Sequence, residues 1–174
     1  MTHPAAPLPE GVTLRPLVAA DADALAPLND AAAPAVPITA PADLARLLEL
    51  AGLALGLERD GRLVGFVIAM HPGAAYASEN YRWFEARGTG HVYVDRIVVA
   101  ESERGRGLGP VLYDAVFGEA RRLGHPEVTC EVNLDPPNPG SLAFHSRLGF
   151  AQIGTQATKG GSVVVALLAA PVET

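Results

Sequence analysis

The sequence predicts an α/β domain (α+β) built on a mixed, mostly antiparallel, twisted sheet of about six to seven strands. Three observations support this fold class. A strand-like run at residues 92–99 leads through a glycine-rich turn into a helix-like stretch that ends at Leu123. Strand-like runs are joined by hairpin turns at Asp60-Gly61 and at residues 159–161. Helical patterns separate the remaining strands, so we expect helices on both faces of the sheet.

The composition indicates one globular domain that follows a short tail. The chain has 174 residues, of which 49% are hydrophobic and 18% are charged, which is enough for one substantial core. Residues 1–11 contain several prolines, and we expect them to be a flexible N-terminal tail. Residues 12–174 are expected to form the single domain.

Charge, cysteine content and hydropathy argue against several classes of partner. The net charge is −6 and the basic residues are scattered, which argues against nucleic-acid binding. A single cysteine excludes an internal disulfide. The longest apolar run, residues 163–171, is far shorter than the roughly 20 residues of a membrane span. With no signal-like segment at the start, we expect a cytoplasmic protein that binds no membrane.

The first half of the chain predicts a strand, two helices and a β-hairpin. Asp21 is a plausible N-cap for the first helix, and Gly52 follows the end of the second. Asp60-Gly61 favours a two-residue hairpin turn, because both residue types accept positive φ angles. The expected ranges are 12–18 for the strand, 20–33 and 40–51 for the helices, and 53–57 and 63–70 for the hairpin strands.

A glycine-rich turn at residues 104–109, Arg-Gly-Arg-Gly-Leu-Gly, connects the strand at 92–99 to the helix that follows. Alternate glycines keep side chains away from a ligand, and the first N–H groups of the helix point outward at its positive dipole end. The turn is therefore a candidate site for a phosphate or pyrophosphate, although a tight connection without a ligand is the alternative. It lacks the Lys-Ser/Thr pair of a P-loop, and Gly109 falls one residue too early for a Rossmann fingerprint.

The second half of the chain predicts a strand at 127–134, a short helix from Asn138 to Phe150 and a closing hairpin at 150–156 and 162–169. Asn138 is a good N-cap, Pro139 suits the first helical position, and Gly149 suits a left-handed C-terminal position.

The glycine-rich turn and the Asn138 helix together resemble two motifs of the GNAT superfamily of acyl-CoA-dependent N-acyltransferases. Arg104, Gly107 and Gly109 match the pyrophosphate motif Arg/Gln-x-x-Gly-x-Gly/Ala. The second motif is matched by Asn138, Phe144, Leu148, Gly149 and Phe150, with His145 where the family usually has Tyr. The resemblance covers residues 93–150. It implies the GNAT fold, in which the two central strands splay apart and the pantetheine of the coenzyme enters the gap.

The resemblance also implies that acetyl-CoA is the co-substrate and that three segments bind it. These are the end of the central strand, the glycine turn and the Asn138 helix. The expected residues are Ile97, Val98, Val99, Arg104, Gly105, Arg106, Gly107, Leu108, Gly109, Asn138, Ser141 and Phe144.

Acyl transfer to an amine requires a base for the ammonium proton and an acid for the departing thiolate. Asp95 and Glu131, on the two strands expected to splay, are candidate bases. An ion pair between Asp95 and Arg96 with a purely structural role is an equally good interpretation of Asp95. The resemblance places at position 145 the Tyr that protonates the coenzyme's sulfur, and His145 can also donate a proton. The alternative is a histidine that only hydrogen-bonds in the interior or packs against the pantetheine, with Tyr113 and Tyr93 as further donors. Cys130 has no basic neighbour to lower its pKa, so we interpret it as a buried bystander.

Residues 71–90 show no periodicity and concentrate aromatic side chains, which is typical of a functional loop. Two interpretations stand: Trp83 and Phe84 plug the core, or Asn80, Tyr81, Trp83 and Phe84 form the wall of the acceptor site. The histidines show no metal-ligand spacing, so no metal is expected.

The expected function is N-acetylation of a primary amine, on a small molecule or a peptide, by direct attack in a ternary complex. The alternative is a catalytically idle module that binds acyl-CoA. A homodimer formed through edge strands is possible in either case.

Overall fold

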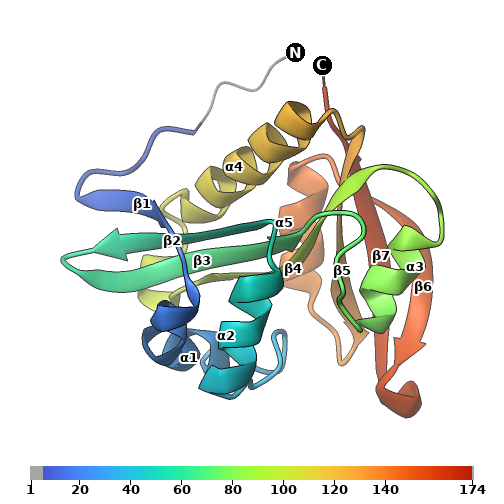
Figure 1. Cartoon of the computed structure of the whole chain (residues 1–174), viewed down its shortest axis with the longest axis horizontal. Coiled ribbons are helices and arrows are strands. Elements are labelled where there is room, and N and C mark those ends of the chain that lie inside the picture. Colours follow the sequence, from blue (N-terminus) through green and yellow to red (C-terminus); the bar gives the residue numbers. More distant parts are fainter. Residues whose placement is uncertain (1–5, 174) are drawn as a thin grey trace.

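The structure is a computed structural model in which residues 6–173 are described; the first five residues of the expected tail and Thr174 lie outside them. Seven strands form one sheet in the order β1-β2-β3-β4-β5-β7-β6 (Figure 1). The strands are β1 (Val12–Pro16), β2 (Leu53–Arg59), β3 (Arg62–Met70), β4 (His91–Val99), β5 (Glu127–Asp135), β6 (Ala151–Thr158) and β7 (Val163–Pro171). The α-helices are α1 (Ala22–Asp30), α2 (Pro41–Leu50), α3 (Glu79–Glu85), α4 (Leu108–Leu123) and α5 (Pro139–Arg147), and three short 3-10 turns accompany them. The predicted fold class is confirmed.

Two elements differ from the sequence-based expectation. The first strand ends at Pro16, and a 3-10 turn at Ala19–Asp21 precedes α1. The segment 71–90, expected to be irregular, contains α3, whose first turn is capped because the Ser78 hydroxyl accepts a hydrogen bond from the Tyr81 amide at 3.2 Å. Seven residues make two turns at most, which is too few for a helical period to be visible in the sequence.

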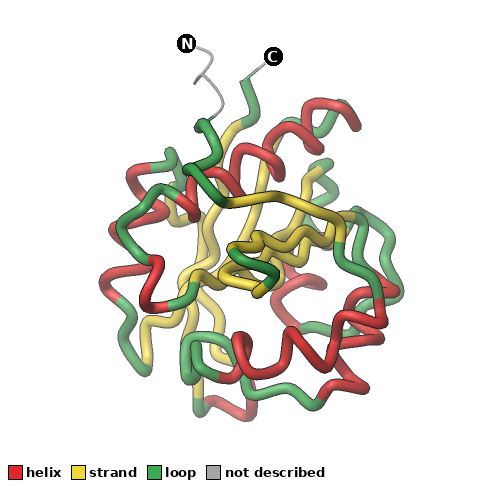
Figure 2. The backbone as a smooth tube through the Cα atoms, turned by 90° about the vertical axis from the view of Figure 1, so that its left-hand side faces the viewer, coloured by secondary structure: helices red, strands yellow, loops and turns green. Residues whose placement is uncertain are grey.

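Helices cover both faces of the sheet, and each face has its own hydrophobic core (Figure 2). Helix α4 packs on one face, where its residues Leu112 and Val116 contact the strands, and Leu142 and Phe144 of α5 pack against the same core. Helices α1, α2 and α3 cover the opposite face with apolar side chains such as Leu25, Leu44 and Phe84. In Figure 1, α4 lies above the sheet, and α1 and α2 lie below it.

The parallel pair β4 and β5 joins two antiparallel halves of the sheet, and it is short. Its register comprises only His91↔Glu127, Val92↔Val128 and Tyr93↔Thr129. Beyond Tyr93, β4 continues beside β3 and β5 continues beside β7. The central strands therefore splay apart, as the resemblance implied. Asp95 lies just past this point, and the register between β3 and β4 shifts beside it, between Ile68 and Ala69.

Among the described residues, we find no helix that combines the length and the hydropathy needed to cross a membrane.

Candidate functional site

The glycine turn adopts a backbone that requires its glycines. Gly105 and Gly107 have φ angles of +75° and +80°, which disfavour other residues, and Gly107 is the N-cap of α4. A Cβ atom added at Gly109 would lie only 2.8 Å from the ring of Phe144, so the start of α4 packs tightly against α5. The first amides of the 16-residue α4 have no acceptor within the helix and lie at its positive dipole end. This geometry suits an anion.

A cavity of about 710 Å³ extends from the glycine turn to the end of β4. A volume of this size is typical of a site for a small molecule or cofactor. Every residue expected to bind the coenzyme lines the cavity except Arg106. The other lining residues include Ala32, Ala35 and Val36, between α1 and α2, together with Glu103, His145 and Arg147.

The charges at the glycine turn include one carboxylate. Glu103 lines the cavity, and its Oε1 atom lies 3.3 Å from Nε of Arg59. The half-exposed guanidinium of Arg106, which is not part of the cavity wall, lies 3.7 Å from Oε2 of the same carboxylate. Two guanidinium groups therefore offset the charge of Glu103, while Arg104 and Arg147 remain as cationic lining residues.

His145 is held by both of its ring nitrogens. The Tyr113 hydroxyl lies 2.6 Å from Nε2, and the carbonyl oxygen of Ser141 lies 2.7 Å from Nδ1. Because a carbonyl can only accept, Nδ1 carries the proton and Nε2 accepts from Tyr113. Burial lowers the pKa of His145, so the imidazole is neutral at neutral pH. The ring connects α5 to α4, and in this arrangement it has no free proton to give to a thiolate.

Asp95 and Arg96 form a buried ion pair, with Nε of Arg96 2.8 Å from the carboxylate and both side chains only 6% exposed. The Tyr76 hydroxyl donates a hydrogen bond to the other oxygen of Asp95. Both carboxylate oxygens are thus occupied, which matches the structural interpretation of this pair.

Glu131 projects from β5 on the face that α3 covers, and it remains partly exposed beside the splay. Its two carboxylate oxygens lie 2.8 and 2.7 Å from the Tyr93 hydroxyl. Burial and the nearby charge of Asp95 raise the pKa of Glu131 to about 8, against the opposing effect of hydrogen bonds from Tyr93 and Asn80. A carboxyl with a pKa near the working pH is suited to proton transfer.

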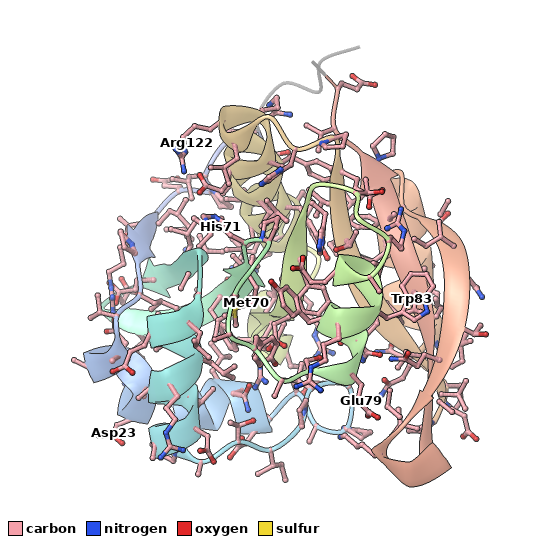
Figure 3. All side chains as sticks on the ribbon, turned by 45° about the vertical axis from the view of Figure 1, so that its right-hand side comes forward. Asp23, Met70, His71, Glu79, Trp83 and Arg122 are labelled. Atoms are coloured by element: carbon pink, nitrogen blue, oxygen red, sulfur yellow. The ribbon has the colours of Figure 1, made fainter. Side chains whose placement is uncertain are left out.

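The residues expected to form the acceptor wall have different surroundings. Tyr81 and Phe84 are 2% and 0% exposed, so almost all of their surface is packed in the core. Trp83, a residue of α3 that is labelled in Figure 3, packs its ring against β6. A Cβ atom added at Gly154 of β6 would lie 2.9 Å from this ring. These three residues fit the interpretation in which the aromatic side chains fill the core. Asn80 instead contacts the Glu131 carboxyl and accepts a hydrogen bond from Gln156 at 2.9 Å.

Sequence reasoning missed the wall formed by residues 32–36 and the Gln156–Asn80 contact, because both join segments that are distant in the chain. No motif marks either of them. Within residues 6–173, no group of three or more His, Cys, Asp or Glu side chains is arranged to hold a metal ion.

Comparison with known proteins agrees with this geometry. The sequence model of the Acetyltransferase (GNAT) family matches residues 23–150. A mycothiol acetyltransferase of Pseudarthrobacter chlorophenolicus is 34% identical over 159 residues, which cover 86% of this chain and 45% of the relative. An L-2,4-diaminobutyric acid acetyltransferase of Nocardia farcinica is 30% identical over 108 residues, 62% of this chain and 48% of the relative. The chain thus spans about half the length of the curated relatives that it matches.

Solved structures share the fold. Ard1 from Thermoplasma volcanium superposes with a TM-score of 0.75 at 18% identity, covering 94% of this chain and 99% of its own. The structure of yncA from Salmonella typhimurium, solved with acetyl-CoA, gives a TM-score of 0.68 at 20% identity, covering 94% and 95% of the two chains. The family match spans most of the domain, including both motifs and the splayed strands, and on this basis the chain belongs to the GNAT family of acetyltransferases.

Proposed function

We propose that the chain is an acetyl-CoA-dependent N-acetyltransferase that acetylates a primary amine by direct attack in a ternary complex. The observation that supports this most directly is the cavity that joins the glycine turn of α4 to the end of β4, where β4 has diverged from β5. Glu131, a carboxyl with a raised pKa, lies beside that divergence.

The residues present fit coenzyme A. The helix start and the glycine turn offer backbone amides to its pyrophosphate, and Arg104 and Arg147 add positive charge. Phe144 and the 32–36 segment supply an apolar wall. When bound, acetyl-CoA would supply the acetyl group, which passes from the thioester sulfur to the amine nitrogen, and coenzyme A would leave as a thiolate that takes its proton from water. Backbone amides of Ile97 to Val99 that face β5 have no hydrogen-bonding partner on that strand, so they are suited to polarise the thioester carbonyl of acetyl-CoA.

Glu131 is the proposed base. An alkyl ammonium has a pKa of about 10.4, so most of the acceptor arrives protonated and must lose a proton before attack. The general-acid role expected for His145 is not part of the proposal, because both ring nitrogens are occupied and the ring is neutral. We assign to His145 the positioning of α5 against α4.

The acceptor is proposed to be a small-molecule amine. The names of two relatives, mycothiol acetyltransferase and L-2,4-diaminobutyric acid acetyltransferase, refer to small molecules rather than to a protein.

The direct test is release of free thiol from acetyl-CoA by the purified chain, measured with a thiol reagent over a panel of diamines, amino acids, aminoglycosides and peptides. We expect turnover with at least one small-molecule amine. Tight coenzyme binding without turnover across the panel would instead favour the idle module.

Gly109→Ala is expected to weaken coenzyme A binding about tenfold or more, because the new methyl group displaces the Phe144 ring that lines the cavity. Isothermal titration calorimetry measures the dissociation constant. Gly118→Ala is the matched control on the same helix, where an added Cβ has nothing within 4 Å. It should leave binding unchanged and stabilise the helix by about 0.5–1 kcal/mol. Equal affinity of the two variants would argue against coenzyme binding at the glycine turn.

Glu131→Gln is expected to reduce kcat about 100-fold or more, since a positioned base contributes about 10²–10⁴. For the wild type, kcat should rise with pH and level off above about pH 8, where the carboxylate is ionised.

The raised pKa of Glu131 also predicts a pH dependence of stability. Folding favours the protonated acid, so the native state loses stability as pH rises from Glu131's ordinary pKa of 4.5 toward about 8. The melting temperature of Glu131→Gln should therefore increase relative to that of the wild type as the pH is raised through this range. The exposed Glu49→Gln is the control, and a wild-type profile without the rise near pH 8 would remove Glu131 from the base role.

His145→Gln is expected to lower the melting temperature, because the loss of satisfied buried hydrogen bonds costs about 1–3 kcal/mol. The kcat should change by less than about fivefold, in contrast to the loss expected when a general acid is removed. Steady-state kinetics and thermal melts compare it with His125→Gln, which alters a half-buried histidine outside the cavity lining. A 100-fold loss of kcat with unchanged stability would restore the general-acid role.

A further inference from the structure

The segment between α1 and α2, residues 31–40, is a wall of the large cavity that has no regular secondary structure. Ala32, Ala35 and Val36 of this segment line the cavity, and Val36 is buried. No strand ladder fixes the backbone here. Its backbone hydrogen bonds are local ones, such as the bond from the Val36 amide to the Ala32 carbonyl oxygen at 3.2 Å. The position of the wall relative to the central strand therefore depends on the packing of Val36 in the core and on side-chain hydrogen bonds at the two ends of the segment.

Arg96 donates hydrogen bonds to residues at both ends of the segment. From its buried place on β4, its Nη1 group donates to Oδ1 of Asn29 and to Oγ1 of Thr39, at 3.0 Å in each case. Asn29 is in the last turn of α1, immediately before the segment, and Thr39 is near the segment's end. One guanidinium group thus connects the start and the end of the wall to the central strand.

Further hydrogen bonds close the loop upon itself. The side-chain amide of Asn29, which is fully buried, donates to the carbonyl oxygen of Pro37 at 3.0 Å and to Asp30 at 2.9 Å. The Asp30 carboxylate also accepts from the Thr39 amide at 3.1 Å. Because Asn29 presents its oxygen to Arg96 and its nitrogen to the segment, the loss of Arg96 would leave a buried acceptor without a partner.

Asp95 keeps the cation in place. A buried guanidinium is costly unless it is paired, and the Asp95 carboxylate lies 2.8 Å from Nε of Arg96. Lysine would not replace Arg96, since an ammonium is a point charge that lacks the planar fork with which the guanidinium reaches Asp95, Asn29 and Thr39 together.

We propose that Arg96 is a positioning residue that holds segment 31–40 as the wall of the acyl-CoA cavity. The inference rests on the proposed function in one respect, since it takes this cavity to be the coenzyme site. Asp95 then belongs to the support of the wall and is not the base.

Hydrogen exchange with mass spectrometry, together with calorimetry of coenzyme A binding, tests the proposal on the full chain. In Arg96→Met, exchange of the 31–40 amides should rise while exchange in β7 stays unchanged. The dissociation constant for coenzyme A should increase about tenfold, as expected from losing hydrogen bonds to a charged group. Where turnover is measurable, Arg96→Met should raise KM for acetyl-CoA. Thr39→Val, which leaves the Asp95–Arg96 pair beside Glu131 intact, should raise KM while kcat changes by less than about twofold. Arg96→Lys should behave like Arg96→Met.

Thr39→Val guards against misfolding of the arginine variants, because it removes one acceptor of Arg96 and leaves the Asp95–Arg96 ion pair intact. It also removes the hydrogen bond from the Thr39 hydroxyl to the Pro37 carbonyl oxygen at 2.8 Å, so its result is read together with that of Arg96→Met. It should shift exchange and affinity in the same direction by a smaller amount. Arg46→Met, which breaks an exposed pair with Asp43 on α2, is the matched control and should change neither quantity. Exchange and affinity that are unchanged in both Arg96→Met and Thr39→Val would overturn the inference, even if the wild type binds the coenzyme. A wild type that does not bind coenzyme A would instead overturn the proposed function, and the exchange data from the free protein would still decide whether Arg96 holds the segment.

Discussion

Strands β4 and β5 are hydrogen-bonded neighbours for three residues and then diverge, and the arrangement of the site depends on this divergence. Each strand retains an antiparallel partner on its other side, β3 for one and β7 for the other, so the separation leaves only the facing edges unpaired. Such edges are normally a liability in a sheet. In this domain the β4 edge, at Ile97 to Val99, borders a cavity.

The parallel direction of the two strands explains why distant motifs meet. Parallel strands end at the same edge of a sheet, so the connections that follow them lie close together. The glycine turn follows β4 and leads into α4, and Asn138 follows β5 and opens α5. The close approach of Gly109 to Phe144 shows how tightly these two helix starts are packed. A substitution in either motif therefore affects the other.

The sheet also separates two kinds of chemistry. On the face covered by α4 and α5, the core is apolar, and His145 and Tyr113 satisfy each other in its interior. On the opposite face, Glu131 lies near the buried Asp95, and Asp95 is neutralised by Arg96 whereas Glu131 has a phenol as its partner. This difference in partners leaves Asp95 with an immediate counter-charge and Glu131 with a raised pKa. It is the physical reason to assign the base role to Glu131 and a supporting role to Asp95.

Local patterns in the sequence predicted most of the elements of this protein and its candidate anion site. Alternation and turn residues located the hairpin at Asp60-Gly61, whose two residues do have positive φ angles, and the glycine turn and the Asn138 cap identified the family motifs. These features depend on residues within a few positions of one another, so they can be recognised from the amino-acid sequence alone. Only the tertiary structure decided the state of each candidate side chain. Whether Asp95 or Glu131 has a cationic neighbour, and whether His145 has a free proton, depends on Arg96, Tyr93 and Tyr113, and burial and pairing of this kind are set by how the strands and helices pack in three dimensions.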